Sequence, residues 1–309
     1  MPQSADEDIF LTIGCRRPRI LPLKEDLFKE KDIDVSMLRL DEIHSVVSGN
    51  KIFKLIYFLK EAMESVHRTI ITFGGAYSNH LAAAAFACEK LNLNCIGIVR
   101  GEQPKEFSHT LLFCRQHGMQ LEFTSRSSYR KTGIEFQRNL ITKHGEHVLI
   151  PEGGFSVKGK KGAELISNYI AGPGFTHVCL PVGTATTFAG IVDSVLKDTK
   201  IIGFGVLKNQ DDIAERFARL KVPATGKYVF LGDYHYGGYA KKNRELICFM
   251  NDFYLKHSIA LDFVYTAKMM SGIYDLAAKD YFDTGAKILC IHTGGLQGND
   301  SLSKNVLNF

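Results

Sequence analysis

Short apolar runs rich in β-branched residues alternate with helical patterns along most of this chain. From residue 37 onward nine runs are typical of strands, and between most of them apolar residues recur about every 3.6 positions. Near-continuous apolar strands that alternate with helices predict a mainly parallel sheet covered by helices on both faces. We therefore expect an α/β protein. The predicted strands lie at 37–41, 68–75, 94–101, 119–125, 147–154, 176–183, 200–207, 228–234 and 287–295, and the predicted helices at 79–91, 108–117, 128–143, 157–171 and 243–256.

Composition and charge narrow the class of protein. With 309 residues, of which 45% are apolar and 23% charged, the chain can bury one large core or two modest ones. The formal charge of +5 comes without a dense run of Lys and Arg, so we expect no nucleic-acid partner. No apolar run reaches the roughly 18 residues of a membrane span, and the acidic N-terminus is unlike a signal peptide, so no membrane partner is expected. The seven cysteines form no C-x-x-C pair and several lie in apolar runs, which indicates buried free thiols and a cytoplasmic location.

Glycine follows four of the predicted strands, where the chain turns toward the next helix. The four segments are "TFGGAYSNH", "PEGGFSVKG", "PVGTATT" and "HTGGLQG". In open α/β sheets the ligand site lies beyond the carboxyl ends of the strands, and glycine lets the backbone approach a ligand closely. Ordinary turn chemistry would explain any one of these loops. Four of them predict a shared ligand site.

One of these loops has the composition of a phosphate site. A buried strand ends at Gly183, and the hydroxyls of Thr184, Thr186 and Thr187 precede a new helix. Backbone N–H groups at a helix start, with hydroxyl donors around them, can hold a phosphate dianion. The alternative is a threonine N-cap on an ordinary helix. The loop is neither G-x-x-x-x-G-K-[ST] nor G-x-G-x-x-G, so we do not expect a nucleoside triphosphate or a dinucleotide.

A second loop carries Ser78 and Asn79 at the start of an alanine-rich helix. Ser78 is as good an N-cap as it is a catalytic group. The segment lacks the G-x-S-x-G of a hydrolase nucleophile, so a hydrolase is a distant alternative. H-E-x-x-H and paired cysteines are missing from the sequence as well, and no metal is expected.

Lys51 stands in "VVSGNKIFKL", where an apolar helix begins. The positive end of the helix dipole and partial burial would both lower the pKa of this lysine. A lysine that loses its proton near neutrality can form a Schiff base with an aldehyde. The alternative is a solvated surface charge. Together with the threonine loop, the pattern favours pyridoxal 5′-phosphate as the cofactor.

Six segments, taken in order, resemble the D-cysteine desulfhydrase and 1-aminocyclopropane-1-carboxylate deaminase family from about residue 37 to the C-terminus. They are "LRLDEIHSVVSGNKIFKL", "FGGAYSNH", "PEGG", "PVGTATTFAG", "FVYTAK" and "IHTGG". The resemblance implies the tryptophan synthase β-like fold, which is fold type II of the pyridoxal-phosphate enzymes. It has two three-layer α/β/α domains with the cofactor in the cleft. It places residues 1–51 plus 146–309 in a large cofactor-binding domain and 52–145 in a small inserted domain, and it implies a homodimer.

The resemblance also implies roles for particular residues. Lys51 would bind the cofactor aldehyde, and Lys54 would contact its phosphate. The remaining cofactor-binding residues would be Asn79 beside the ring, Thr184, Ala185, Thr186 and Thr187 in the phosphate loop, and Thr266 at the pyridine nitrogen. Ser78, Tyr239 and Tyr265 would act with Lys51 in catalysis, and the substrate pocket would be lined by Ser78, Asn79, His80 and Thr293.

Three of these positions favour the desulfhydrase form of the family. At the positions that correspond to 266 and 293 the deaminase pattern has Glu and Leu, whereas this chain has Thr266 and Thr293. His80 also matches the desulfhydrase form. A threonine hydroxyl would leave the pyridine nitrogen nearly neutral, whereas an acid would keep it protonated. The expected reaction is α,β-elimination on a small amino acid, from D-cysteine to pyruvate, ammonia and sulfide. One alternative is deamination of the cyclopropane amino acid to 2-oxobutanoate and ammonia, and another is a phosphometabolite-binding protein without catalysis, which would not need Lys51.

Overall fold

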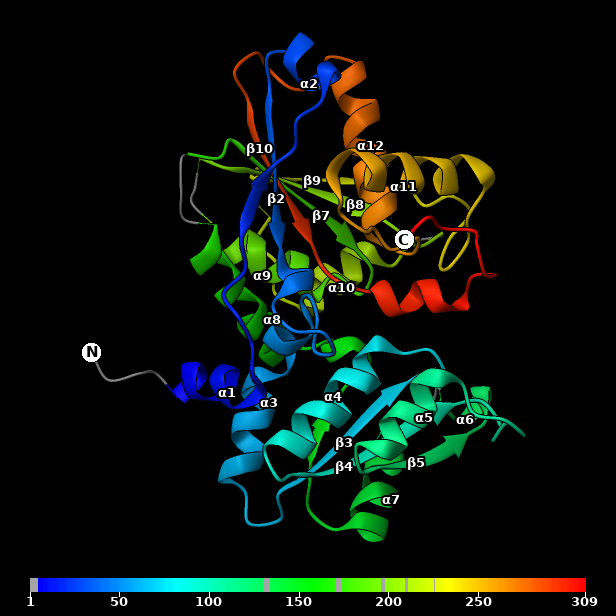
Figure 1. Cartoon of the computed structure of the whole chain (residues 1–309). Coiled ribbons are helices and arrows are strands. Elements are labelled where there is room, and N and C mark those ends of the chain that lie inside the picture. Colours follow the sequence, from blue (N-terminus) through cyan, green and yellow to red (C-terminus); the bar gives the residue numbers. More distant parts are fainter. Residues whose placement is uncertain (1–4, 130–133, 171–173, 196–197, 209–210, 225) are drawn as a thin grey trace. The chain divides into compact units, whose positions relative to one another are not determined.

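The structure of the protein, a computed structural model, describes residues 5–129, 134–170, 174–195, 198–208, 211–224 and 226–309 (Figure 1). The chain forms two compact units. The first unit comprises the described parts of 1–16, 44–47 and 51–162, and the second unit those of 17–43, 48–50 and 163–309.

The second unit is built on a six-stranded sheet with the strand order β1-β2-β10-β7-β8-β9. β1 is antiparallel to β2, and the other neighbouring strands are parallel. Gly203 of β8 faces Phe188 of α9, whereas the next residue, Phe204, faces Gly272 of α12. Because successive residues of a strand point to opposite faces, α9 and α12 cover opposite faces of the sheet. The strands are β1 (Ile20–Pro22), β2 (Asp34–Arg39), β7 (His177–Val182), β8 (Lys200–Gly205), β9 (Tyr228–Leu231) and β10 (Lys287–His292), and the helices are α2 (Asp26–Glu30), α9 (Thr186–Ser194), α10 (Ile213–Arg219), α11 (Arg244–His257) and α12 (Thr266–Ala278), with 3-10 turns η1 (Leu40–Glu42), η3 (Leu165–Tyr169) and η4 (Leu296–Ser301).

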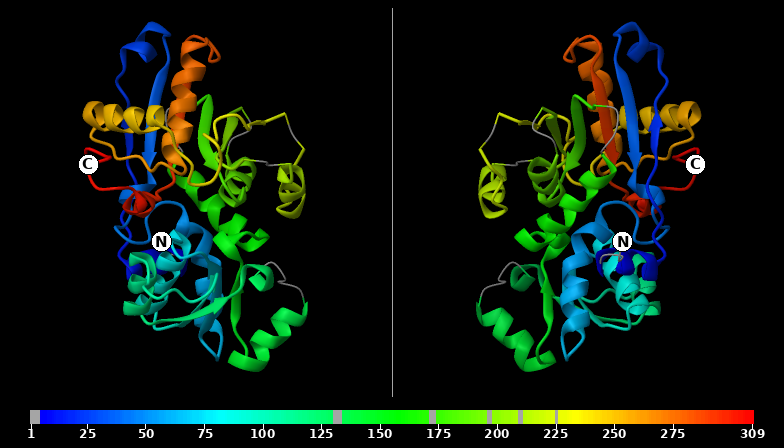
Figure 2. Two further views of the ribbon diagram at one scale, coloured as in Figure 1. Left: turned by 90° about the vertical axis from the view of Figure 1, so that its right-hand side faces the viewer. Right: turned by 90° about the vertical axis from the view of Figure 1, so that its left-hand side faces the viewer.

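The core of the second unit lies between the sheet and the helices α11 and α12, which contact each other and lie crosswise (Figure 2). Met37, Phe204 and Ile288 of the sheet pack there against Phe253 of α11 and Met270 of α12, and all five side chains are buried. This apolar layer positions the first turn of α12, which carries candidate site residues.

The first unit is built on a four-stranded sheet with the order β5-β4-β3-β6, in which all neighbours are parallel. Thr72 of β3 meets His80 of α4, whereas the adjacent Phe73 meets Phe136 of α7, so α4 and α7 cover opposite faces. Each unit therefore has three layers. The strands are β3 (Thr69–Gly74), β4 (Asn94–Arg100), β5 (Met119–Thr124) and β6 (Val148–Ile150), and the helices are α1 (Ala5–Ile13), α3 (Lys51–Glu64), α4 (Asn79–Lys90), α5 (His109–Gln116), α6 (Arg126–Tyr129), α7 (Ile134–His144) and α8 (Val157–Glu164), whose last residues enter the second unit, with the 3-10 turn η2 (Glu152–Gly154).

The α/β prediction is confirmed, and each of the nine predicted strands overlaps a strand of the structure. The expected small domain was 52–145, whereas the first unit also takes in residues before 17 and continues to Gly162. It does so because α1 packs on α3 and α4 and because β6 pairs with β3. The exact domain boundaries remain a prediction. Part of the predicted helix at 128–143, namely 130–133, lies outside the described residues, as does the end of the helix predicted at 157–171.

The seven cysteines are free thiols, as expected, but burial was predicted too broadly. Cys248 is exposed because it lies on the solvent side of α11, and Cys15 is half-buried. No helix within the described ranges has the length and apolar character that would be needed to cross a membrane.

Candidate active site

The loop from Gly183 to Thr187 joins β7 to α9 in the second unit. Ala185 caps the helix in a left-handed conformation with φ of 69°, and no side chain among the described residues caps the first turn. Thr184 Oγ1 and Thr186 Oγ1 lie 3.2 Å apart. The threonine N-cap alternative is therefore wrong, because the capping position belongs to an alanine. A helix start without a side-chain cap, surrounded by hydroxyls, suits an anion.

Asn50 ties three segments of the second unit together. Its side-chain amide donates to Thr187 Oγ1 over 2.8 Å, and its main-chain N–H donates to Thr293 O over 3.1 Å. Gly49 has a φ of 72°, and a Cβ at this position would lie 1.9 Å from Thr293 O. The close approach therefore requires glycine. Lys51, the next residue after Asn50, begins α3 as the sequence predicted.

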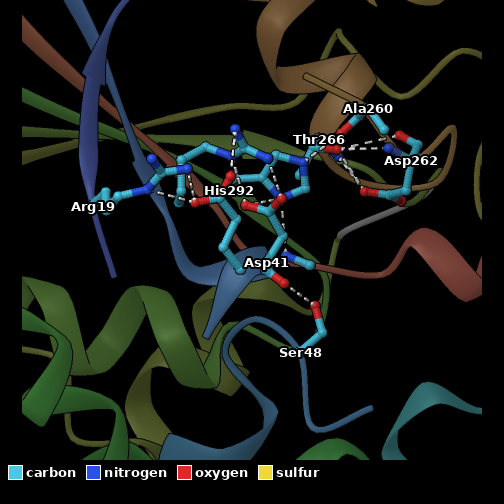
Figure 3. Close-up of polar contacts among 10 residues, drawn as sticks. Arg19, Asp41, Ser48, Ala260, Asp262, Thr266 and His292 are labelled. Atoms are coloured by element: carbon cyan, nitrogen blue, oxygen red, sulfur yellow. Dashed lines mark hydrogen bonds and ion pairs between the residues drawn. The ribbon is translucent and has the colours of Figure 1, made fainter. Parts of the chain in front are cut away.

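Thr266 and Asp262 form a buried pair at the start of α12 (Figure 3). Thr266 Oγ1 donates to Asp262 Oδ2 over 2.6 Å and accepts from the Asp262 N–H over 2.9 Å. The carboxylate also accepts from the N–H groups of Val264, Tyr265 and Thr266. Asp262 therefore satisfies the N–H groups at the start of α12, where Tyr265 is the N-cap residue, and orients the Thr266 hydroxyl. Sequence reasoning missed Asp262, although an acid four residues before a threonine at a helix start was a usable signal.

The two candidate tyrosines lie close together beside the threonine loop. A Cβ on Gly183 would lie 3.2 Å from Tyr265 Cε1, which places the Tyr265 ring against that loop. The Tyr239 ring stands edge-on to Tyr265 with 6.5 Å between the ring centroids. Tyr239 is 55% exposed. The second unit thus brings together the threonine loop, Tyr239 and Tyr265.

A buried polar network supports the strand ends that lead to these loops (Figure 3). Arg39 donates to both carboxylate oxygens of Asp41 over 2.9 and 2.7 Å, and the main-chain oxygen of Asp41 accepts from Ser48 Oγ over 3.0 Å. His292 Nε2 lies 2.8 Å from Ala260 O, and since a carbonyl can only accept, Nε2 carries the proton. The network holds Ser48 through Asp41 O, and it holds His292, the residue before Thr293, through Ala260 O.

The first unit carries two candidate lysines at the start of α3. Lys54 is 5% exposed and forms no ion pair or hydrogen bond with the described residues. Burial and the nearby charge of Lys51 hold the pKa of Lys54 well below its ordinary value. A buried cation without a counterion is unfavourable. Lys54 therefore marks a place that suits an anion.

Ser78 caps α4 by accepting from the Leu81 N–H over 3.3 Å, so the N-cap interpretation is confirmed and any catalytic role is additional. A Cβ on Gly74 would lie 2.6 Å from Ser78 Oγ, so glycine there admits the serine. The next residue, Asn79, has a buried Oδ1 without a hydrogen-bond partner among the described residues. An unpaired buried amide oxygen is costly and indicates a ligand contact.

His80 has a defined tautomer. Thr72 Oγ1 donates to Ile150 O over 3.0 Å, so it must accept from His80 Nε2–H, which lies 2.9 Å away. Burial and the charges of Lys54 and Lys51 hold the pKa of His80 well below its ordinary value, which keeps the ring neutral. His80 Nδ1 is therefore a bare acceptor, and no described residue donates to it.

Comparison with known proteins agrees with this chemistry. The family model for "Pyridoxal-phosphate dependent enzyme" matches residues 23–294. A Pyrococcus furiosus protein named "Putative 1-aminocyclopropane-1-carboxylate deaminase" is 30% identical over an alignment of 297 residues that covers 89% of each chain. A "D-cysteine desulfhydrase" of Salmonella choleraesuis is 25% identical over an alignment of 284 residues that covers 85% of this chain and 87% of the relative. A solved structure described as an ACC deaminase homologue superposes with a TM-score of 0.74 and 27% identity, covering 94% of this chain and 95% of the other.

The described residues fit this cofactor. In the first unit the buried Lys54 suits an anion, and the unpaired Asn79 oxygen suits a polar group on the cofactor ring. In the second unit the start of α9, which has no side-chain cap, suits a phosphate dianion. Among the described residues, no group of three or more His, Cys, Asp or Glu side chains is arranged to hold a metal ion. The chain belongs to the family of pyridoxal-phosphate dependent enzymes and has their type II fold.

Proposed function

We propose that this enzyme catalyses α,β-elimination on a small amino acid that carries a leaving group on Cβ. The proposed substrate is D-cysteine, and the products are pyruvate, ammonia and sulfide. The choice of D-cysteine as substrate rests on the buried hydroxyl of Thr266 at the start of α12. The deaminase pattern has a glutamate at this position. The Salmonella relative named D-cysteine desulfhydrase supports the choice.

Five groups of this chain would hold the cofactor. Lys51 Nζ would bind the aldehyde carbon, Lys54 and the 184–187 loop the phosphate, Asn79 the ring edge, and Thr266 Oγ1 the ring nitrogen. When bound, pyridoxal phosphate supplies an electron sink for the pair released at the substrate Cα. The protein supplies orientation and proton transfer.

The proton steps fall to residues around that ring. Lys51 Nζ, once freed, would take the proton from the substrate Cα. The hydroxyls of Tyr239 and Tyr265 would hold the carboxylate or protonate the departing sulfur, and Ser78 would assist them. His80 Nδ1, as a neutral acceptor, suits an N–H, O–H or S–H donor of the ligand.

Asp262 modifies the expected effect of Thr266. Because the Thr266 hydroxyl donates to Asp262 Oδ2, its remaining lone pair would accept from a protonated ring nitrogen. The expected near-neutral pyridine nitrogen followed from the Thr266 hydroxyl alone, without the Asp262 carboxylate. The carboxylate acts through one intervening hydroxyl and favours ring protonation less than a carboxylate in direct contact, since Coulomb energy falls with distance.

The second candidate is deamination of 1-aminocyclopropane-1-carboxylate to 2-oxobutanoate and ammonia. It is favoured by the names of the Pyrococcus relative and of the solved structure. Ser78 and one tyrosine would assist ring opening. A binding protein without catalysis is not proposed further, because the chain belongs to an enzyme family.

Product analysis tests the proposal. Protein loaded with pyridoxal phosphate should convert D-cysteine to pyruvate, ammonia and sulfide in equal amounts. Lys51→Ala should release none of the three, whereas Lys60→Ala, farther along the same helix, should match the wild type. Loaded wild-type protein that releases no sulfide from D-cysteine would rule the proposal out.

We also propose a cytoplasmic homodimer. The seven free thiols support a reducing compartment. The dimer is supported by the family resemblance and is tested by light scattering on a sizing column.

A further inference from the structure

Lys268 is a fully buried lysine that the proposed chemistry does not use. It lies in the first turn of α12, two residues after Thr266, and has no exposed surface. Its Nζ donates to Gly238 O over 2.7 Å and lies 3.4 Å from Val206 O. No carboxylate among the described residues forms an ion pair with it. Its polar contacts are therefore with backbone carbonyls.

The two carbonyls belong to connections at the carboxyl ends of neighbouring strands. Val206 directly follows β8, and Gly238 lies in the connection between β9 and α11. Burial lowers the pKa of Lys268 to about 8, although the Asp262 carboxylate acts to raise it. Near neutral pH the side chain is thus mostly an ammonium, which makes a stronger hydrogen bond than a neutral donor.

The segment that Lys268 contacts also has local hydrogen bonds, since the Gly237 N–H donates to His235 Nδ1 over 2.9 Å and the Gly238 N–H donates to His235 O over 3.0 Å. Gly237 and Gly238 have φ of 91° and 117°, a region that favours glycine over residues with a side chain. Tyr239 follows them and is more than half exposed. The Gly238 carbonyl accepts from Lys268 Nζ and from the Lys241 N–H over 3.1 Å.

We propose that Lys268 is a positioning residue that holds the Gly237–Gly238 segment so that Tyr239 stands edge-on to Tyr265. The inference rests on the proposed role of Tyr239 at the substrate. Through Gly238 O, the first turn of α12 controls both the Tyr265 ring and the Tyr239 ring. Loss of the ammonium removes the hydrogen bond that joins Gly238 O to α12 and leaves the Thr266 contacts in place.

A fluorescence reporter tests the positioning without any turnover. The chain has no tryptophan, so Tyr239→Trp places a single reporter at this position. Adding Lys268→Met should shift the emission to the red and increase acrylamide quenching, in protein with or without cofactor. Lys241→Met is the matched control, because it removes an exposed ammonium from the same segment and keeps the backbone bond to Gly238. It should leave the emission unchanged.

Met has nearly the length of Lys and removes a buried charge, which proteins often tolerate without loss of stability. If Lys268→Met nevertheless does not fold, Lys268→Arg keeps a charged donor and should keep the emission of the parent reporter. Unchanged emission and quenching in Lys268→Met, or the same change in Lys241→Met, would overturn the proposal.

Kinetics with a double-mutant cycle provide the second readout. Lys268→Met and Tyr239→Phe should each lower kcat/KM about tenfold, and the double variant should fall little below the lower single variant. Cofactor affinity should stay unchanged. Two losses that multiply would mean that Lys268 acts independently of Tyr239 and would contradict the inference. If the wild type proves inactive on D-cysteine, the proposed function fails, and the emission data still decide the role of Lys268.

Discussion

Two lysines of this chain are buried for different reasons, and the residues around them show why. The ammonium of Lys268 meets two backbone carbonyls, which partly replace water. Lys54 meets no hydrogen-bond acceptor among the described residues. The neighbouring charge of Lys51 lowers the pKa of Lys54 further, because two like charges repel each other. A protein keeps such a cation where a ligand supplies the missing negative charge. Lys54 is thus costly to the cofactor-free protein and useful to the loaded one.

Lys54→Met should therefore separate stability from cofactor binding. Without cofactor the variant should be as stable as the wild type or more stable, because a buried unpaired charge is removed. Its affinity for pyridoxal phosphate should fall at least about tenfold, or about 1.4 kcal/mol. Urea unfolding of the cofactor-free protein and a cofactor titration measure the two effects. Lys60→Met on the same helix is the control, and equal losses in both variants would contradict the role of Lys54.

The sequence allowed some of these residues to be predicted and concealed others. Lys51 and the threonine loop stood out because each has an unusual place at a helix start. Asp262 and Lys268 were missed because a pattern reveals spacing and not which buried polar groups face each other. Lys268 lies in an apolar helix, where the sequence gives no sign that its ammonium reaches two carbonyls of other connections.

At the scale of elements, loops from distant parts of the chain interlock in the second unit. The turn at 48–50 contacts the segment after β10, where the Asn50 N–H donates to Thr293 O, and it contacts η1, where the Gly49 N–H donates to Leu40 O. Gly49 and Gly294 approach so closely that a Cβ on either would lie within 3 Å of the other segment. This contact sets the position of the last residue before α3.

Gly49→Ala should be far more damaging than an alanine at an equivalent backbone angle elsewhere. Gly285 in the same unit has a φ of 77° but open space around its Cβ, so Gly285→Ala should cost about 1–2 kcal/mol from backbone strain alone. Gly49→Ala adds a clash with Thr293 O and should cost roughly 1–3 kcal/mol more. Chemical unfolding of both variants gives the comparison. Equal losses of unfolding free energy in the two variants would show that the contact between Gly49 and Thr293 adjusts without cost and would contradict the prediction.

Helices of the second unit are joined by a buried carboxylate. Glu25, which begins α2, accepts from Tyr274 of α12 over 2.7 Å and lies 2.9 Å from both Lys256 and His257 of α11. Burial acts to raise the pKa of Glu25, but these hydrogen bonds outweigh it and leave the pKa below its ordinary value. The ionised carboxylate therefore stabilises the fold above the unfolded-state pKa.

Acid should remove this contribution. As the pH falls below about 4.3, the ordinary glutamate value, and through the lower folded-state pKa, the wild type should lose the stability that Glu25 provides. Glu25→Gln should be about 1–3 kcal/mol less stable than the wild type at neutral pH. The difference in unfolding free energy between the wild type and Glu25→Gln should become smaller in acid. Urea unfolding across the acid range measures it, with exposed Glu30→Gln as the control. A difference that stays constant with pH would contradict the assignment.

At the scale of the whole molecule, the sequence predicted the fold class and nearly all strands, because buried parallel strands have a strong and continuous apolar signal. β1 was missed, since it has three residues and ends at Pro22. The described extent of the first unit differs from the expected small domain, because α1 packs there through contacts that no local pattern reveals. Substrate choice is the part that neither pattern nor family membership determines.

Turnover of two substrates by one preparation tests the central claim most directly. Wild-type protein loaded with pyridoxal phosphate is given D-cysteine or 1-aminocyclopropane-1-carboxylate, and 2-oxo acid release is followed to obtain kcat/KM for each. The account predicts that kcat/KM for D-cysteine exceeds that for the cyclopropane amino acid by at least about tenfold, a transition-state difference of about 1.4 kcal/mol. A higher kcat/KM for the cyclopropane amino acid would contradict it.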